Sequence, residues 1–103
     1  CAKKRNVVVN ITQYNNDYPM KCDENIIKKL EAACKKENTS YIKTISGAFH
    51  DSMLVGEFAP VAMVFVPSKD GISHSPNEWT NFEDIAAGTN ILTDTLVELA
   101  NEI

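Results

Sequence analysis

Two histidines stand in loops whose composition suits them to hold an imidazole at a fixed angle. His50 lies in the stretch 46–53 (SGAFHDSM), and His74 lies in the stretch 67–78 (PSKDGISHSPNE). Gly47 and Gly71 allow tight or left-handed turns without a side-chain clash. An imidazole presented in this way is suited to binding a metal ion or to polarising a substrate carbonyl.

Carboxylates accompany both histidines. Asp51 follows His50 directly, and Glu78 lies four residues after His74, so either could fix an imidazole tautomer. From spacing alone, a loop histidine in a small domain is more often a solvated side chain, and such carboxylates are more often caps or surface charges. No HxH or HExxH pattern is present, so the residues by themselves define half of a metal site at most.

Other kinds of chemistry have less support. The 103 residues carry a formal net charge of −4, which does not favour nucleic acid. The longest apolar run, 60–67, is far shorter than the roughly 20 residues of a membrane-spanning helix. There is no P-loop, no dinucleotide fingerprint and no nucleophile elbow. We therefore expect neither a nucleic-acid partner nor a membrane partner.

The three cysteines, Cys1, Cys22 and Cys34, have neither CxxC spacing nor the density of a disulfide-stapled module. We expect reduced thiols and a cytoplasmic location. The chain begins with Cys1 rather than Met, which suggests a piece of a longer protein.

The pattern along the chain predicts an α/β fold, a mixed sheet with helices packed on it. β-branched or apolar runs predict strands at 6–12, 41–45 and 61–66, the last buried on both faces. Asp23 can cap a helix that ends near Asn38, with its lysines on a solvated face. Thr80 and Glu83 form a capping box before a closing helix, weakened by a glycine, whose apolar stripe is Ile85, Ile91, Leu92, Leu96, Leu99 and Ile103. The histidine loops, 46–59 and 68–81, follow two of these strands, where ligands collect in open α/β sheets.

At these loops the chain resembles the metal-dependent amidohydrolases of the M20 peptidase superfamily. The resemblance is to the hydantoinase/carbamoylase branch, which includes N-carbamoyl-L-amino acid hydrolases, allantoate amidohydrolases and β-ureidopropionases. It runs through 46–53, 63–68 (MVFVPS) and 71–76 (GISHSP) with Glu78, in the order that this branch uses. It covers essentially the whole chain.

The resemblance implies that the chain is the C-terminal part of a zinc-peptidase-like catalytic domain. Residues 1–18 would be the last strand of a lid and dimerisation domain plus a linker, and residues 19–103 would be the C-terminal part of the catalytic domain. The parent enzyme would be a homodimer with two divalent ions, zinc or manganese, in each active site. The other metal ligands would lie in the rest of the parent chain.

The resemblance also implies residue roles. His74 matches the last metal-binding histidine. His50 matches the catalytic histidine that binds substrate and polarises the scissile carbonyl or stabilises the oxyanion. Two further roles come from the residues and not from the resemblance: the physics of turns suggests that Gly71 and Ser73 shape the substrate-binding loop, and the spacing of Asp51 and Glu78 would let their carboxylates orient the imidazoles. The reaction would be hydrolysis of a C–N bond in N-carbamoyl amino acids or related ureido compounds, and the segment would be inactive alone.

Phe49 departs from the branch, which usually has Gly directly before this histidine. A ring there would narrow the pocket or change the angle of the loop. Phe49 and the missing metal ligands leave one alternative open, a non-catalytic interaction module derived from the family. A second alternative is a fragment of an M20 aminoacylase or peptidase, against which the run 71–76 (GISHSP) argues. If the chain exists as this piece alone, we expect self-association through apolar surfaces such as 61–66.

Overall fold

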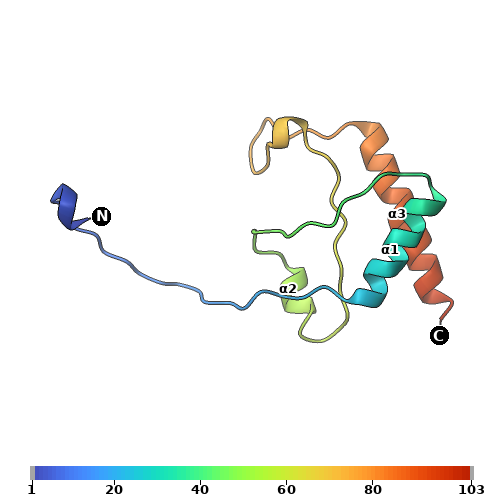
Figure 1. Cartoon of the computed structure of the whole chain (residues 1–103), viewed down its shortest axis with the longest axis horizontal. Helices are drawn as coiled ribbons and strands as arrows, with labels where there is room; N and C mark the ends of the chain where they lie inside the picture. Colours follow the sequence, from blue (N-terminus) through green and yellow to red (C-terminus); the bar gives the residue numbers. More distant parts are fainter. Residues whose placement is uncertain (1, 103) are drawn as a thin grey trace.

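The computed structural model describes residues 2–102, in which helices are joined by long extended segments (Figure 1). The α-helices are α1 (Glu24–Lys36), α2 (Ser52–Val55) and α3 (Phe82–Ala100). Two short 3-10 helices, η1 (Lys3–Arg5) and η2 (Lys69–Gly71), lie outside them. No helix among these residues is long and apolar enough to cross a membrane.

Helix α1 begins where the sequence predicts. The Asp23 carboxylate accepts hydrogen bonds from the backbone N–H groups of Asn25 and Ile26, both at 2.9 Å, and so satisfies two N–H groups that have no partner in the first turn. The helix ends at Lys36, and Asn38 then takes a left-handed conformation with φ of 51°. The predicted end near Asn38 is therefore confirmed to within two residues.

Helix α3 packs against α1, and their contact forms the core of the described chain (Figure 1). Ala33 and Cys34 of α1 are buried against Ile91 of α3, with Leu30 beside them. Thr95 is buried as well, and its hydroxyl is satisfied because it donates to the Ile91 carbonyl at 2.8 Å. Cys22 and Cys34 are free thiols, as expected, whereas Cys1 lies outside the described residues.

Parts of the predicted pattern on α3 are wrong. The N-cap position of the helix is held by Asn81 and not by Thr80, and the Asn81 side chain accepts no hydrogen bond from a backbone N–H of the first turn. Only Ile91 of the predicted stripe is buried and Leu99 is half-buried, whereas Ile85, Leu92 and Leu96 are exposed. Ile103 lies outside the described residues. The apolar stripe of α3 is wider than the part of the α3 surface that α1 covers.

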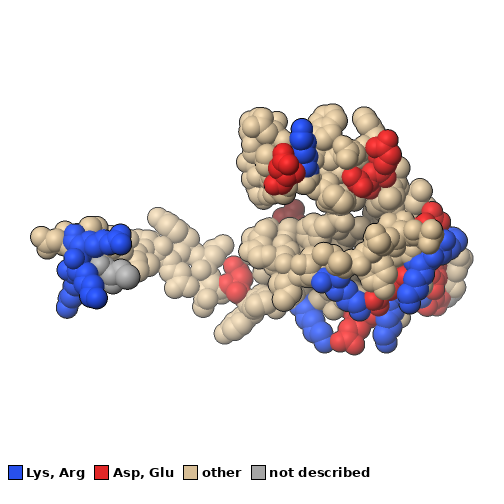
Figure 2. Space-filling model, turned by 45° about the horizontal axis from the view of Figure 1, so that its top comes forward, with Lys and Arg blue, Asp and Glu red and all other residues tan. Residues whose placement is uncertain are grey.

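Lys29 is another departure, because it is buried rather than solvated. Its side chain is 9% exposed, and its ammonium group forms ion pairs with Glu98, at 3.3 Å, and with Glu102. The hydrogen bond to Glu102 is the main cause that raises the pKa of Lys29. Figure 2 shows basic and acidic side chains interleaved over this end of the molecule.

The predicted mixed sheet is wrong. Segments 6–12, 41–45 and 61–66 are all without regular secondary structure, and residues 2–102 contain no β-strand. A helix satisfies its backbone hydrogen bonds within one segment, whereas a strand needs a second strand beside it. No two of these segments pair with one another, so an α/β class does not describe this chain.

Segment 61–66 nevertheless has a defined place. The Val61 carbonyl accepts a hydrogen bond from the Asp23 N–H at 2.7 Å, at the start of α1. At its other end Val66 packs on α3 at Gly88, where an added Cβ would lie 2.5 Å from Val66 Cγ1. Gly88, which weakens the helix by its intrinsic propensity, is thus the position that lets the segment approach. Val64 and Phe65 are exposed, so the expected burial on both faces is not observed.

The N-terminal residues extend away from the helix pair (Figure 1). The radius of gyration is 18.5 Å, against about 13 Å for a compact domain of this length. Val8, Ile11, Tyr14 and Tyr18 on this segment are all almost fully exposed. Figure 2 shows the basic side chains of η1, from Lys3 to Arg5, gathered at its far end.

Candidate functional site

The segment that leads to His50 is attached to α1 by one carboxylate. Glu31 accepts a hydrogen bond from the Tyr41 hydroxyl at 3.1 Å and forms an ion pair with Lys43 at 2.8 Å. The hydrogen bond to Lys43 is the main cause that lowers the pKa of Glu31, and the same bond raises the pKa of Lys43. These contacts fix residues 41–43 on α1, three residues before the His50 loop begins at Ser46.

The His50 imidazole is half-buried and has two neighbours. Ser46 Oγ lies 2.6 Å from His50 Nε2, and the Phe65 ring lies 5.7 Å from the imidazole, centroid to centroid, tilted by 58°. The backbone is fixed as well, because the His50 carbonyl accepts a hydrogen bond from the Met53 N–H at the start of α2. The ring is therefore held by one hydrogen bond, one aromatic contact and a helical turn.

The His74 loop is closed at its base by hydrogen bonds between its two ends. The Trp79 carbonyl accepts from the Lys69 N–H at 2.8 Å and from the Ser68 hydroxyl at 3.4 Å. The same hydroxyl also contacts the Ile72 carbonyl. In Figure 1 α2 and η2, which belong to the two histidine loops, lie to the left of α1 and α3, and the second loop then runs to the start of α3.

His74 adopts a left-handed backbone conformation, with φ of 54°. A non-glycine residue in this region stores strain of about 1–3 kcal/mol, and such residues cluster at functional sites. The Glu78 carboxylate supports the conformation by accepting from the His74 backbone N–H at 2.9 Å. The side chain of His74 is exposed, so its imidazole is accessible to a ligand.

The remaining predicted site residues lie on the two loops without contacting a histidine ring. Gly71 has φ of 67°, and an added Cβ would meet no atom within 4 Å; glycine is needed there for its backbone conformation. Ser73 is exposed beside His74. Asp51 precedes α2, where its side chain forms no capping hydrogen bond. The contact of Glu78 runs to the backbone of His74, which differs from the expected contact with the imidazole.

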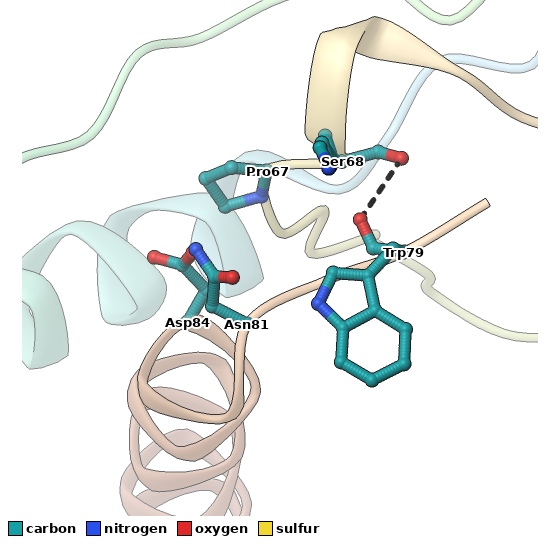
Figure 3. A pocket seen from close by; sticks show the side chains of 6 residues that line it. Pro67, Ser68, Trp79, Asn81 and Asp84 are labelled. Carbon is teal, nitrogen blue, oxygen red and sulfur yellow. Dashed lines mark hydrogen bonds between the residues drawn. The ribbon is translucent and has the colours of Figure 1, made fainter. Parts of the chain in front are cut away.

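A shallow pocket of about 360 Å³ lies at the base of the His74 loop (Figure 3). Asn81 and Asp84, at the start of α3, face Pro67, and Trp79 and Ser68 complete the rim. Neither histidine lines this pocket. His74 is exposed and His50 is half-buried, and the two imidazoles lie outside this pocket.

The described residues do not form a complete metal site. Among residues 2–102, no three His, Cys, Asp or Glu side chains gather closely enough to hold a metal ion. His50 contacts Ser46 and Phe65, whereas His74 contacts Glu78 through its backbone. A zinc site takes three or four protein ligands, and the described residues around either histidine do not bring such a set together.

Two neighbours of His50 were missed by reasoning from the sequence. Ser46 stands four residues before His50 with Gly47 between them, a spacing that lets a turn bring the hydroxyl back to the ring. Phe65 had no such signal, because its contact joins residues fifteen positions apart.

Comparison with known proteins gives a family match that covers most of the chain. Residues 6–98 match the model of peptidase family M20/M25/M40. N-carbamoyl-L-amino-acid amidohydrolase of Pseudomonas sp. (strain NS671) is 41% identical over 80 residues, which are 78% of this chain and 19% of the relative. Hydrolases of this family generally depend on metal ions.

Two further relatives have names that refer to other ureido compounds. Ureidoglycolate hydrolase of Arabidopsis thaliana is 38% identical over 96% of this chain and 21% of its own length. Allantoate amidohydrolase of Escherichia coli (strain K12) is 34% identical over 89% of this chain and 22% of its own length. The chain thus spans about a fifth of the length of these curated relatives.

Proposed function

Because the chain belongs to peptidase family M20/M25/M40, we propose that it is the C-terminal segment of a metal-dependent amidohydrolase that cleaves a C–N bond of a carbamoyl or ureido substrate. One observation carries this proposal. Relatives named for three substrates, an N-carbamoyl amino acid, ureidoglycolate and allantoate, each align with more than three quarters of the chain. These substrates share a carbonyl between nitrogen atoms, so the shared chemistry is hydrolysis at that carbonyl.

In this proposal His74 supplies one metal ligand. Its imidazole is exposed on a loop closed at its base by the contacts of the Trp79 carbonyl, and the Glu78 carboxylate holds its strained backbone. A neutral imidazole is a common ligand for zinc and manganese. When bound, two such ions would polarise the scissile carbonyl and lower the pKa of water. The remaining ligands would come from the rest of the parent chain.

His50 has the second role, as the residue that contacts the substrate. An N–H of its ring would donate a hydrogen bond to the substrate oxygen as negative charge develops there, and a fixed donor of this kind stabilises the transition state. Gly71 and Ser73 would shape the surface on which the substrate lies, and Asp51 would add negative charge beside His50. Residues 1–18 would belong to a lid and dimerisation domain, and residues 19–103 to the catalytic domain of a homodimer.

The experiment is to purify the full-length protein that contains this segment and to compare it with its His74→Ala variant. We expect the variant to lose at least about 100-fold in kcat/KM, the loss expected when a ligand of an activating ion is removed. We also expect its zinc or manganese content to fall. Asn77→Ala, in the same loop, is the matched control, because the Asn77 side chain forms no hydrogen bond among the described residues.

Substrate choice tests the two alternatives. Hydrolysis of N-carbamoyl amino acids, allantoate or ureidoglycolate supports the proposal, whereas preference for N-acyl amino acids or peptides would assign an aminoacylase or peptidase. No hydrolysis by a metal-loaded full-length protein would favour an interaction module. Equal activity in His74→Ala and the parent would remove His74 from the mechanism.

A further inference from the structure

The contacts of His50 determine which of its two ring nitrogens carries the proton. A neutral imidazole has one N–H donor and one acceptor nitrogen, and the partner of one nitrogen decides the state of the other. Within residues 2–102, Ser46 is the one hydrogen-bond partner of the ring, through Oγ at 2.6 Å from Nε2. Nδ1 has no partner among these residues.

The hydrogen bonds of the Ser46 hydroxyl favour one direction for this contact. Ser46 Oγ already accepts from the Ala48 N–H at 3.3 Å, and a hydroxyl has one hydrogen to donate. If the Ser46 hydroxyl donates to His50 Nε2, its hydrogen bonds to the imidazole while its oxygen accepts from the Ala48 N–H. If Nε2–H donated instead, the hydrogen of this half-buried hydroxyl would have no protein acceptor among the described residues. A hydroxyl that accepts one bond also becomes a better donor in the next.

We propose that Ser46 is a positioning residue that donates to His50 Nε2 and holds the imidazole in the tautomer protonated at Nδ1. The Nδ1–H group is then the free donor that meets the substrate oxygen. The tautomer follows from the contacts of this chain alone, and only the use of Nδ1–H toward substrate rests on the function proposed above. No covalent step is involved.

Phe65 contributes to the same geometry. Exchanging the positions of Nδ1 and Nε2 requires the imidazole to turn over within its site. The Phe65 ring, tilted by 58° at 5.7 Å, lies against the imidazole and restricts this rotation. Ser46 therefore selects the proton position, and Phe65 keeps the protonated nitrogen on one side.

Nuclear magnetic resonance of the 103-residue chain with ¹⁵N-labelled histidine tests the tautomer directly. The ¹⁵N shifts of a neutral imidazole distinguish a protonated nitrogen from an unprotonated one. We expect His50 to be protonated mainly at Nδ1. His74 is the internal reference, since its ring is exposed and should favour the Nε2–H form of an unrestrained imidazole. A His50 ring protonated mainly at Nε2 would overturn the proposal.

Variants separate the hydrogen bond from a structural effect. In Ser46→Ala we expect the His50 tautomer ratio to move toward that of His74, and in Ser46→Thr, which keeps a hydroxyl, we expect it to return. Ser40→Ala is the matched control, because Ser40 is exposed and its side chain forms no hydrogen bond among the described residues. The helical circular dichroism signal of each variant, to which α1 and α3 contribute most, checks that the variant is folded. An unchanged ratio in a folded Ser46→Ala variant would contradict the assignment.

Kinetics of the full-length protein test the use of Nδ1–H. Loss of one hydrogen bond predicts that Ser46→Ala lowers kcat about three- to tenfold with little change in KM, whereas His50→Ala should cost about 100-fold or more. If His50→Ala retains full activity, the function proposed for His50 fails, while the tautomer measured in the 103-residue chain still decides the role of Ser46. If His50→Ala is inactive and Ser46→Ala is fully active, the positioning role is wrong.

Discussion

Gly88 is the residue at which two opposing effects can be weighed. Alanine in mid-helix is favoured over glycine by about 1 kcal/mol, but its Cβ would lie 2.5 Å from Val66 Cγ1. Valine is stiff at χ1 and cannot easily turn away, and overpacking costs about 1–3 kcal/mol. We therefore expect Gly88→Ala to lower the free energy of unfolding, by about 1 kcal/mol, in urea denaturation followed by circular dichroism.

The control for this prediction removes the opposing side chain. In a Val66→Ala background the same Gly88→Ala change should be neutral or stabilising, because only the gain in helix propensity is left. Equal effects in both backgrounds would show that Val66 does not set the requirement for glycine.

At the scale of single residues, a local signal was sufficient at the start of α1 but not at the start of α3, where Asn81 and not Thr80 holds the N-cap position. Asp23 stands directly before an apolar helical pattern, and its capping role is confirmed. The role of Gly88 could not be predicted, because the atom that requires it belongs to Val66, far away in the sequence. The same holds for Phe65 beside His50. The roles of His50 and His74 stay predictions.

Among the elements, the start of α1 offers a direct comparison with the start of α3. Asp23 caps two backbone N–H groups, whereas the Asn81 side chain caps none. We expect Asp23→Ala to destabilise the helix pair by about 1 kcal/mol, seen as a lower midpoint in thermal unfolding. Asn81→Ala should change the midpoint much less. Similar losses in the two variants would argue against a capping role for Asp23.

The attachment of segment 41–45 to α1 should depend on pH. Glu31 has a lowered pKa in the folded chain, chiefly through its hydrogen bond to Lys43. The contribution of the ionised Glu31 carboxylate to the attachment is therefore fully present above the ordinary glutamate pKa of about 4.3. It is lost as the pH falls through the lowered pKa of the folded chain. We expect the amide shifts of residues 41–45 to move toward disordered values in this acidic range.

A variant assigns that change to Glu31. In Glu31→Gln, the amide shifts of residues 41–45 should have moved toward disordered values already at neutral pH, because the glutamine amide cannot form the ion pair with Lys43. Glu37→Gln, which changes an exposed carboxylate at the end of the same helix, should behave as the parent does. Detachment at the same pH in parent and Glu31→Gln would show that another group controls it.

The elements also show why half of the predicted architecture is wrong. The helices are specified by periodicity and by the end signals within each segment, so α1 and α3 were predicted nearly at their observed bounds. Val-rich runs such as 61–66 have the composition of strands, but pairing depends on a second segment in register. No local pattern reveals whether that segment is present.

For the whole molecule, exposed apolar surface leads to a prediction about association. Val64 and Phe65 are exposed together with much of the N-terminal segment, including Val8 and Ile11. Apolar surface on this scale favours contact between copies. We expect the 103-residue chain to sediment as an oligomer, and Val64→Lys to shift it toward monomer. Asn90→Lys, on the exposed surface of α3, should not. A monomeric parent chain would contradict this.

The overall extent of the molecule was also not predictable from composition. A chain with 44% hydrophobic residues has the composition of a compact domain, yet the radius of gyration is 18.5 Å. The reason is distribution: the buried core involves α1 and α3, and the residues from 6 to 22 contribute almost nothing to it.

Two neighbouring residues of segment 61–66 join distant parts of this molecule. Successive side chains of an extended backbone point in opposite directions, so Phe65 reaches the His50 imidazole while Val66 rests on α3 at Gly88. The His50 loop and α3 therefore contact adjacent residues of the same extended segment, Phe65 and Val66, on its two opposite faces. The spacing of one peptide unit between these residues sets how far the imidazole lies from the helix.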